Sequence, residues 1–235
     1  MIKKLHDAIE DSERIVFFTG AGMSTDSGIP DFRSAAGLYT NNLRAEEIIS
    51  HSYFMTDPEG FYDFYKEKMV FPDARPNYGH EYIASLQDRK DVRVVTQNID
   101  GLHQLAGSRE VYELHGSIHR NYCMKCHKFY TLADILERGR VPYCDCGGLI
   151  KPDVVLYEEG LDPLTIEKSI DAIEKADMLV ILGTSLVVYP AASFIYYFRG
   201  RHLAVINKSA TAADARCEIV IHDSISDTFK ALNDL

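Results

Sequence analysis

The sequence has no long apolar run and no excess of positive charge, and both absences narrow its possible function. Its longest apolar run covers residues 178–182, which is far too short to span a bilayer. It carries 35 acidic against 25 basic residues, a formal net charge of -10, so it lacks the basic footprint of general nucleic-acid binding. We therefore expect no membrane and no direct nucleic-acid partner. The acidic charge suits a lysine-bearing peptide, although many soluble proteins share it.

The start of the chain also lacks the apolar segment of a secretory signal. Met1-Ile2-Lys3-Lys4 is followed at once by His6 and Asp7, so we expect a cytoplasmic protein. Five cysteines in that reducing compartment indicate metal ligation or free thiols rather than disulfides. The oligomeric state is not fixed by the sequence; without a coiled-coil pattern, a monomer is favoured.

Short apolar runs alternate with amphipathic segments along much of the chain, which has 235 residues and 46% hydrophobic content. The runs read as buried strands at 15–18, 92–96, 178–182, 203–206 and 219–221. Helical patterns cover 3–13, 79–88, 164–175, 190–198 and 226–232. Strands that alternate with helices predict an α/β fold with a doubly wound, mostly parallel sheet.

Two stretches interrupt this alternation. Residues 36–78 are rich in Tyr and Phe and look helical, and residues 119–150 hold four of the five cysteines. We interpret them as a helical module and a metal-binding module of a smaller inserted domain. The sheet domain would then comprise 1–35, 79–118 and 151–235.

Small or hydrogen-bonding residues follow four of the expected strands. Ligands in open α/β sheets bind beyond the carboxyl ends of the strands, so these segments should meet in one crevice. The segments are 19–24, 97–100, 183–185 and 207–209. Their convergence predicts a nucleotide site.

The turn after the first strand contains Gly20 and Gly22, which allow backbone N–H groups to approach a phosphate. Gly-x-Gly alone is a weak motif that also fits a plain tight turn, and the usual third glycine is replaced by Thr25. The continuation through residues 27–33 strengthens the prediction. There Arg33 can pair with a diphosphate, and Phe32 offers a flat aromatic face.

The cysteines form two close pairs, Cys123-x-x-Cys126 and Cys144-x-Cys146, with 17 residues between them. This spacing is typical of a structural zinc site with four thiolates, which has no open position for catalysis. Zinc would fold a segment too small to bury its own core. The short second pair could strain the site, and His119 and His127 are weaker substitute ligands.

Together these segments resemble the sirtuins, a family of NAD-dependent protein deacylases, and in particular its bacterial-type deacetylases. The matching segments are residues 20–24, 28–33, 96–103, 113–116, 152–155, 183–186 and 207, with the four cysteines in the family's order. The resemblance implies a Rossmann-like large domain and a smaller domain made of a helical and a zinc module. NAD, as co-substrate, and an acetyl-lysine peptide would meet between them.

The resemblance also implies a set of NAD-binding residues. The glycine turn and Thr25 would hold the diphosphate side, Phe32 would shield the ribose C1′, and Arg33 would contact phosphate. The remaining implied contacts run from the nicotinamide end to the adenosine end. The full set is Gly20, Ala21, Gly22, Thr25, Asp31, Phe32, Arg33, Gln97, Asn98, Ile99, Asp100, Gly183, Thr184, Ser185, Asn207 and Ile225.

His115 and Asn98 are the implied catalytic residues. His115 would deprotonate a ribose hydroxyl after nicotinamide has left, which suits a side chain with a pKa near neutrality, and Asn98 would order water. His103 is the rival base, although we expect it to pack or hydrogen-bond on a helix. The implied products are nicotinamide and O-acetyl-ADP-ribose. The alternatives are ADP-ribosyl transfer, removal of longer apolar acyl groups, and an NAD-sensing module without activity.

Two segments bear on substrate choice. Family members that prefer acidic acyl groups share a Phe-Tyr-x-x-Arg pattern, whereas here Tyr62 is followed by Tyr65 in place of the arginine. A succinyl carboxylate would lack its partner, so we predict acetyl or apolar acyl groups, with partial compensation by Lys66 or Lys68. The expected walls of a peptide groove, where the substrate would add as a strand, are Val154, Val155, Leu156, Val187 and Tyr189.

Overall fold

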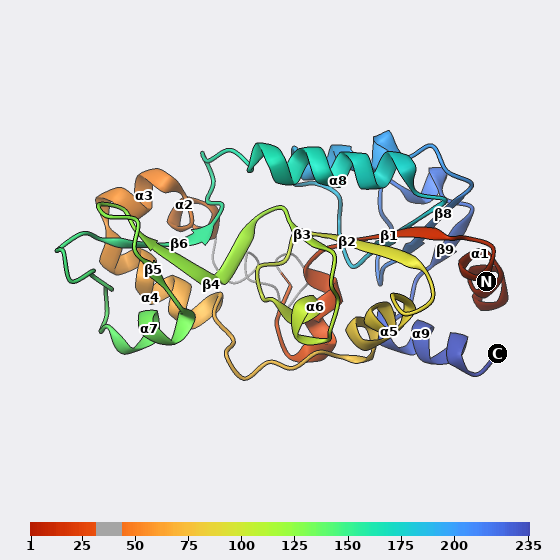
Figure 1. Cartoon of the computed structure of the whole chain (residues 1–235), viewed down its shortest axis with the longest axis horizontal. Coiled ribbons are helices and arrows are strands. Elements are labelled where there is room, and N and C mark those ends of the chain that lie inside the picture. Colours follow the sequence, from red (N-terminus) through yellow and green to blue (C-terminus); the bar gives the residue numbers. More distant parts are fainter. Residues whose placement is uncertain (32–43) are drawn as a thin grey trace.

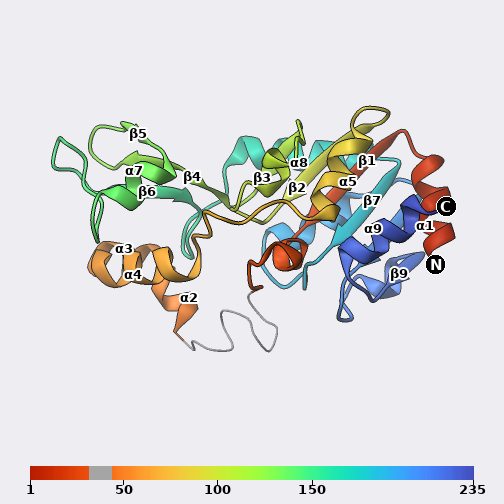
Figure 2. The ribbon, with the colours of Figure 1, turned by 90° about the horizontal axis from the view of Figure 1, so that it is seen from below.

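The computed structural model describes residues 1–31 and 44–235, which form a large and a small lobe (Figures 1 and 2). The large lobe contains a six-stranded sheet in the order β3-β2-β1-β7-β8-β9, and every adjacent pair is parallel. Its strands are β1 (Arg14–Thr19), β2 (Asp91–Thr96), β3 (Val111–Glu113), β7 (Met178–Leu182), β8 (His202–Ile206) and β9 (Ile219–Ile221). The expected doubly wound parallel sheet is confirmed.

The sheet is buried on both faces because its strands are apolar throughout. Along β1, Ile15 and Phe17 pack into one core, whereas Val16 and Phe18 pack into the other. The first face is covered by α1 (Ile2–Glu10), α5 (Tyr78–Leu86) and α9 (Ile225–Asn233), and the second by α8 (Pro163–Lys175) and the 3₁₀ helix η2 (Ala191–Tyr197). Parallel sheets require this double cover, which leaves the strand ends as the place for a ligand.

The small lobe combines a three-stranded antiparallel sheet with short helices. The sheet has the order β5-β4-β6, from β4 (Gly116–Cys123), β5 (Phe129–Tyr130) and β6 (Ile150–Val154). The helices are α2 (Ala45–Ile48), α3 (His51–Thr56), α4 (Pro58–Lys68) and α7 (Leu132–Glu137). Rings of α3 and α4, among them Phe54, Phe61 and Tyr62, share one core with Ile118 and Ile150 of the sheet, so the two modules fold as one lobe.

Some expected elements differ in detail. Residues 190–198 hold a 3₁₀ helix rather than an α-helix, and residues 69–77, which contain Pro72 and Pro76, are not helical. The three-residue strand β3 was not expected. Three further short helices are η1 (Ala21–Ser27), α6 (Leu102–Leu105) and η3 (Asp214–Arg216). Within the described ranges, no helix has the length and apolar character needed to cross a membrane.

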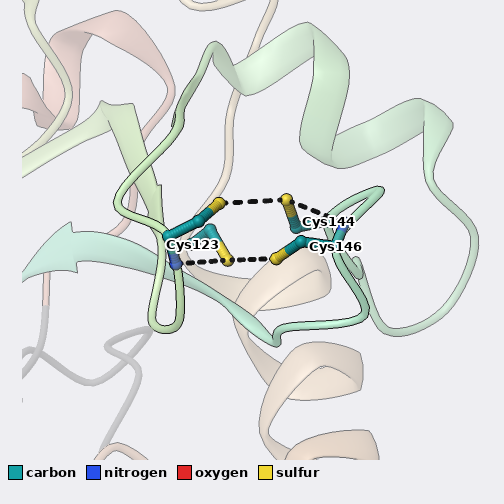
Figure 3. Close-up of side chains that lie close together, drawn as sticks. Cys123, Cys144 and Cys146 are labelled. Carbon is teal, nitrogen blue, oxygen red and sulfur yellow. Dashed lines mark hydrogen bonds between the residues drawn. The ribbon is translucent and has the colours of Figure 1, made fainter.

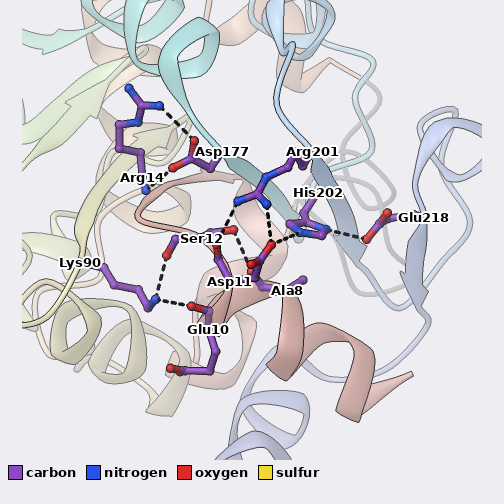
Figure 4. Close-up of polar contacts among 10 residues, drawn as sticks. All are labelled: Ala8, Glu10, Asp11, Ser12, Arg14, Lys90, Asp177, Arg201, His202 and Glu218. Atoms are coloured by element: carbon purple, nitrogen blue, oxygen red, sulfur yellow. Dashed lines mark hydrogen bonds and ion pairs between the residues drawn. The ribbon is translucent and has the colours of Figure 1, made fainter.

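The amino end of the parallel sheet is closed by polar contacts (Figure 4). Arg14 at the start of β1 pairs with Asp177, with Nη2 at 3.0 Å from Oδ1. His202 at the start of β8 contacts Asp11 through Nε2 at 3.1 Å, and the Lys90 ammonium donates to the Ser12 carbonyl at 2.7 Å. The polar groups at the amino ends of the strands therefore bond to one another and connect neighbouring parts of the sheet. The carboxyl ends of the strands remain available for a ligand.

Candidate active site

A cavity of about 930 Å³ lies at the carboxyl edge of the parallel sheet and extends to the small lobe. Segments that follow four strands line it, at 20–31, 97–100, 183–185 and 207–210. The cavity brings together nearly all the NAD-binding residues expected from the sequence. These are Gly20, Ala21, Gly22, Thr25, Asp31, Gln97, Asn98, Ile99, Asp100, Gly183, Thr184, Ser185, Asn207 and Ile225. Phe32 and Arg33 lie outside the described residues.

The floor of the cavity is a contact between two backbone turns. The N–H of Gly22 donates to the Gly183 carbonyl at 2.8 Å, and a Cβ on Gly22 would lie only 2.7 Å from the Gly183 Cα. Gly183 itself has φ +58°, and a Cβ there would lie 2.4 Å from the Met23 nitrogen. Only glycine fits at this approach. The turn continues as a 3₁₀ helix, in which the Thr25 hydroxyl donates to the Gly22 carbonyl at 3.0 Å.

Asn98 is buried and is held by the glycine turn. Its Nδ2 donates to the Gly20 carbonyl at 3.1 Å and to the Ser24 Oγ at 3.2 Å. Ser24 in turn donates to Asp100 at 2.6 Å, and the Leu102 N–H donates to the other carboxylate oxygen at 2.9 Å. Burial raises the pKa of Asp100, and these two donors partly oppose that shift. Because Nδ2 is committed to the protein, the Asn98 Oδ1 is the atom suited to a ligand or an ordered water.

His115 follows β3 and lines the same cavity. Its Nδ1 lies 3.0 Å from the carbonyl oxygen of Gln97, which can only accept, so Nδ1 carries the hydrogen and Nε2 keeps its lone pair in the neutral ring. Burial lowers the pKa of His115, and the hydrogen bond to Gln97 partly opposes the shift. A neutral imidazole with a free Nε2 is the form that a general base requires.

His103, the rival base, lies outside the cavity. Its side chain on α6 is 1% exposed, and its Nε2 contacts the Thr19 hydroxyl. A base must reach the proton that it removes, and of these two histidines it is His115 that lines the cavity.

The side of the cavity toward the small lobe is largely apolar. Ile49, Met69, Phe71 and Ile118 line it, whereas neither Tyr62 nor Tyr65 does. The Tyr62 hydroxyl is already committed to the Ile150 carbonyl. Lys68 reaches the cavity, but Lys66 lies on a separate depression and donates to the Gly139 carbonyl.

The expected peptide walls are only partly arranged as predicted. Val154, Val155, Leu156 and Tyr189 line the cavity, but Val187 does not and is 51% exposed. Residues 186–189 are not a strand, because Leu186 has φ +55° and turns the chain. On the other side of the cavity, the Val155 N–H donates to the His115 carbonyl at 3.0 Å.

The four cysteines form a compact cluster at the far end of β4 (Figure 3). Cys123 and Cys146 have sulfurs 3.5 Å apart, as do Cys126 and Cys144, and all four sulfurs lie within 4.8 Å of one another. Tetrahedral zinc with Zn–S bonds of about 2.3 Å separates its sulfurs by about 3.8 Å, so the set fits a structural zinc ion.

Nearby donors stabilise the thiolates of this cluster. The Cys146 N–H and the Tyr130 hydroxyl both donate to the Cys144 sulfur and lower the pKa of that thiol. The substitute ligands are not needed: His127 is not part of the cluster, and His119 contacts the Asp100 carbonyl through Nε2 at 3.0 Å. The short Cys144-x-Cys146 pair brings both of its sulfurs into the cluster.

The cavity also contains residues that the sequence did not single out as ligands. Ser24 lies within the quoted glycine segment, and its position between Asn98 and Asp100 depends on folding. Asp223, shortly after β9, also lines the cavity. The rule applied to the other strands, that ligands lie beyond their carboxyl ends, would have found it.

Fold and site together define a nucleotide-binding α/β protein with a structural zinc module. The sequence model of the Sir2 family matches residues 20–190. An NAD-dependent protein deacetylase of Clostridium perfringens is 56% identical over 231 residues, which cover 95% of each chain. One from Staphylococcus aureus strain N315 is 47% identical over 237 residues, which cover 98% of this chain and 97% of the relative. The chain therefore belongs to the Sir2 family, as its sequence motifs predicted.

Solved Sir2 structures share the whole fold. A Sir2 variant with a deacetylated p53 peptide and 3′-O-acetyl-ADP-ribose superimposes with a TM-score of 0.93 at 35% identity, covering 99% of this chain and 97% of that one. A Sir2 complex with a p53 peptide and NAD⁺ gives 0.89 at 37% identity, covering 100% and 98%.

Proposed function

We propose that this chain is an NAD-dependent protein-lysine deacetylase. In this reaction acetyl-lysine, NAD and water yield lysine, nicotinamide and O-acetyl-ADP-ribose. The observation that carries the proposal is His115, a neutral base held by the Gln97 carbonyl in the cavity that also contains the glycine turn and Asn98. The names and bound molecules of its relatives support the same activity.

The residue roles follow from the position of each group. Gly20 and Gly22 line the cavity on the diphosphate side, where a Cβ would meet Thr184 or Gly183. Their own N–H groups already donate to the carbonyls of Leu182 and Gly183, so, contrary to the expectation from the sequence, these two groups do not bind the phosphate. Asn98, through its Oδ1, holds the nicotinamide ribose or an ordered water. Ile99 and Asp100 receive the nicotinamide carboxamide, since a buried carboxyl group with a raised pKa can accept and, when protonated, donate.

The remaining NAD contacts extend along the strand ends. The Gln97 Nε2 donates to the Thr184 Oγ1 at 3.0 Å, which joins the nicotinamide side to the β7 turn. Ser185, Asn207 and Ile225 line the adenosine end.

His115 acts after nicotinamide has left. Its Nε2 removes a proton from a ribose hydroxyl, whose oxygen then attacks the acyl carbon. The Gln97 carbonyl keeps the Nδ1–H in place and stabilises the imidazolium that forms. Loss of His115 should therefore reduce turnover more than NAD binding.

The acyl-lysine enters from the side of the small lobe. Val154, Val155 and Leu156 offer an edge for the peptide backbone, with Tyr189 opposite. The apolar group of Ile49, Met69 and Phe71 favours an uncharged acyl chain and leaves room for longer apolar groups as a second activity.

Mass spectrometry of the purified protein with NAD and an acetyl-lysine peptide tests the proposal. We expect nicotinamide, deacetylated peptide and O-acetyl-ADP-ribose. His115→Ala should reduce turnover by about two to four orders of magnitude, with zinc content and NAD affinity retained. His6→Ala, on α1 and away from the cavity, is the matched control. ADP-ribosylated protein without O-acetyl-ADP-ribose would instead establish ADP-ribosyl transfer, and full activity of His115→Ala would refute the mechanism.

We further propose a cytoplasmic monomer that acts on acetylated proteins. Light scattering of the purified chain tests the oligomeric state.

The domain limits proposed from the sequence would assign residues 151–235 to the large domain. β6 at Ile150–Val154 pairs with β4, which favours a boundary a few residues later. Limited proteolysis of the purified chain tests this boundary.

A further inference from the structure

Two buried histidines lie behind the cavity without lining it. His80 on α5 and His103 on α6 are 0% and 1% exposed, and their ring centroids are 4.8 Å apart. Each ring has one nitrogen without a partner among the described residues, Nε2 of His80 and Nδ1 of His103. Buried polar atoms are normally satisfied, so this pair requires an explanation.

The tautomer of His80 is fixed by its helix cap. The backbone N–H of Asn77 donates to the His80 Nδ1 at 3.3 Å, so that nitrogen carries a lone pair. Burial lowers the pKa of His80 to about 4, so the ring is neutral near pH 7 and its hydrogen is on Nε2. The unpartnered atom of His80 is therefore a donor.

The tautomer of His103 follows from the two threonines beside it. The Thr19 hydroxyl donates to the Thr96 Oγ1 at 2.8 Å, so its oxygen accepts from the His103 Nε2 at 3.1 Å. Burial lowers the pKa of His103 well below its usual range, so this ring is also neutral, and Nδ1 carries a lone pair. The unpartnered atom of His103 is an acceptor, and the adjacent ring of His80 presents a donor.

The same series of bonds ends at the candidate active site. The backbone N–H of Asn98 donates to the Thr96 Oγ1 at 3.0 Å, and the Asn98 side chain holds the glycine turn and Ser24. We propose that His103, whose Nε2 contacts Thr19, is a positioning residue for Asn98. It acts through Thr19 and Thr96 and touches neither substrate. Its effect on turnover rests on the proposed deacetylase function, whereas its effect on Asn98 does not.

Two amide substitutions at His103 separate this role from simple packing. His103→Gln places an N–H donor near the Nε2 position and keeps the bond to Thr19. His103→Asn places its amide near Nδ1 and loses that bond. Both variants put a polar amide in the same site, so a purely structural role would affect them similarly.

Hydrogen exchange of the Asn98 amide, followed by NMR, tests the positioning directly and requires no activity. We expect exchange about tenfold faster in His103→Asn than in wild type, and close to wild type in His103→Gln. Nitrogen chemical shifts of both rings at pH 7 should report the Nε2–H tautomer. Equal exchange in the two variants, or a Nδ1–H tautomer at His103, would overturn the inference.

Turnover provides the second readout. His103→Asn should lower kcat about ten- to a hundredfold relative to His103→Gln, with the KM for the peptide and the Tm of the two variants similar. If kcat falls in the two variants in proportion to the fall in Tm, the loss of turnover reflects stability and contradicts a positioning role for His103. If His103→Asn does not fold, Thr19→Val and Thr19→Ser are compared instead. Valine removes the hydroxyl that bonds to Thr96, whereas serine keeps it. An inactive wild type would refute the proposed function alone, because amide exchange still decides the inference.

Discussion

The tightest constraint on a single residue lies at the floor of the cavity, where Gly22 meets Gly183. A Cβ on Gly22 would face backbone atoms at 2.7–3.1 Å, and backbone cannot rotate away as a flexible side chain can. We therefore expect Gly22→Ala to destabilise the fold by about 1–3 kcal/mol and to weaken NAD binding. Urea unfolding and calorimetric titration with NAD measure the two effects.

Gly160→Ala is the matched control for this prediction. Its Cβ would meet nothing within 4 Å, so stability and NAD affinity should stay near wild type. Tight NAD binding by Gly22→Ala would show that the two turns can separate without loss of the site.

The pH dependence of turnover is also set by single residues. The base form of His115 is the neutral one, and burial lowers its pKa below the usual 6.5. We therefore expect kcat/KM to be level near pH 7–8 and to fall as the pH drops through a value below 6.5. Burial also raises the pKa of Asp100 above its usual value. The residual activity of His115→Ala should not show the fall in kcat/KM that protonation of His115 causes. An inflection of the wild-type profile above pH 7 would argue against His115 as the base.

Many residues of the site could be predicted at this scale, because strand ends converge in any parallel α/β sheet. The positions of Gln97, Thr184 and Asn207 follow from that rule. The contact of His80 with His103 could not be predicted, because the two residues lie on separate helices, α5 and α6, that meet only in the tertiary structure. Ser24 was not predicted for the same reason, since its partners are 74 and 76 residues away.

Among the elements, those of the zinc module depend most on a bound metal ion for their stability. Its β5 has two residues and its α7 has six, too few to be stable without the cluster of cysteines. We expect a strong chelator, or Cys144→Ser, to release zinc, loosen β4–β6 and abolish deacetylation. Atomic emission and circular dichroism follow the two changes.

Cys217→Ser serves as the control for the cysteine substitution. Cys217 is a free thiol outside the cluster, so zinc content and activity should be unchanged. Retention of a folded small lobe after complete removal of zinc would show that its apolar core is sufficient.

The elements that sequence patterns missed, or whose helix type they did not predict as in η2, are the short ones. β3 has three half-buried residues with no apolar run, and η1 and η2 are 3₁₀ helices of seven residues. Periodicity is weak over such lengths, and their geometry is set by neighbours such as the contact between Gly22 and Gly183. The long buried strands and α8 were predicted because their pattern extends over enough residues.

At the scale of the whole molecule, the cavity draws its walls from both lobes, and this joint wall sets the choice of acyl group. Its apolar lining from the small lobe would surround a succinyl carboxylate without a guanidinium partner. We expect kcat/KM for an acetyl peptide to exceed that for the succinyl peptide at least about tenfold. Parallel assays on otherwise identical peptides decide this, and faster desuccinylation would contradict it.

Among the described residues, Lys68 is the lysine that lines the cavity on the side of the small lobe, and it would moderate this preference; the other lysine of the lining, Lys208, follows β8. Lys68→Met should widen the gap between acetyl and succinyl peptides. Lys66→Met, on the same helix but outside the cavity, should leave it unchanged.

A final consequence concerns β4, which starts directly after His115 and ends at Cys123. Its eight residues thus connect the proposed base at one end with a proposed metal ligand at the other, and its pairing with β6 shifts register between Ser117 and Asn121 (Figure 1). We expect a change in geometry at the cysteine cluster to reach the His115 imidazole through β4. The ring resonances of His115 should therefore respond to zinc exchange for cadmium, while those of His6 on α1 should not.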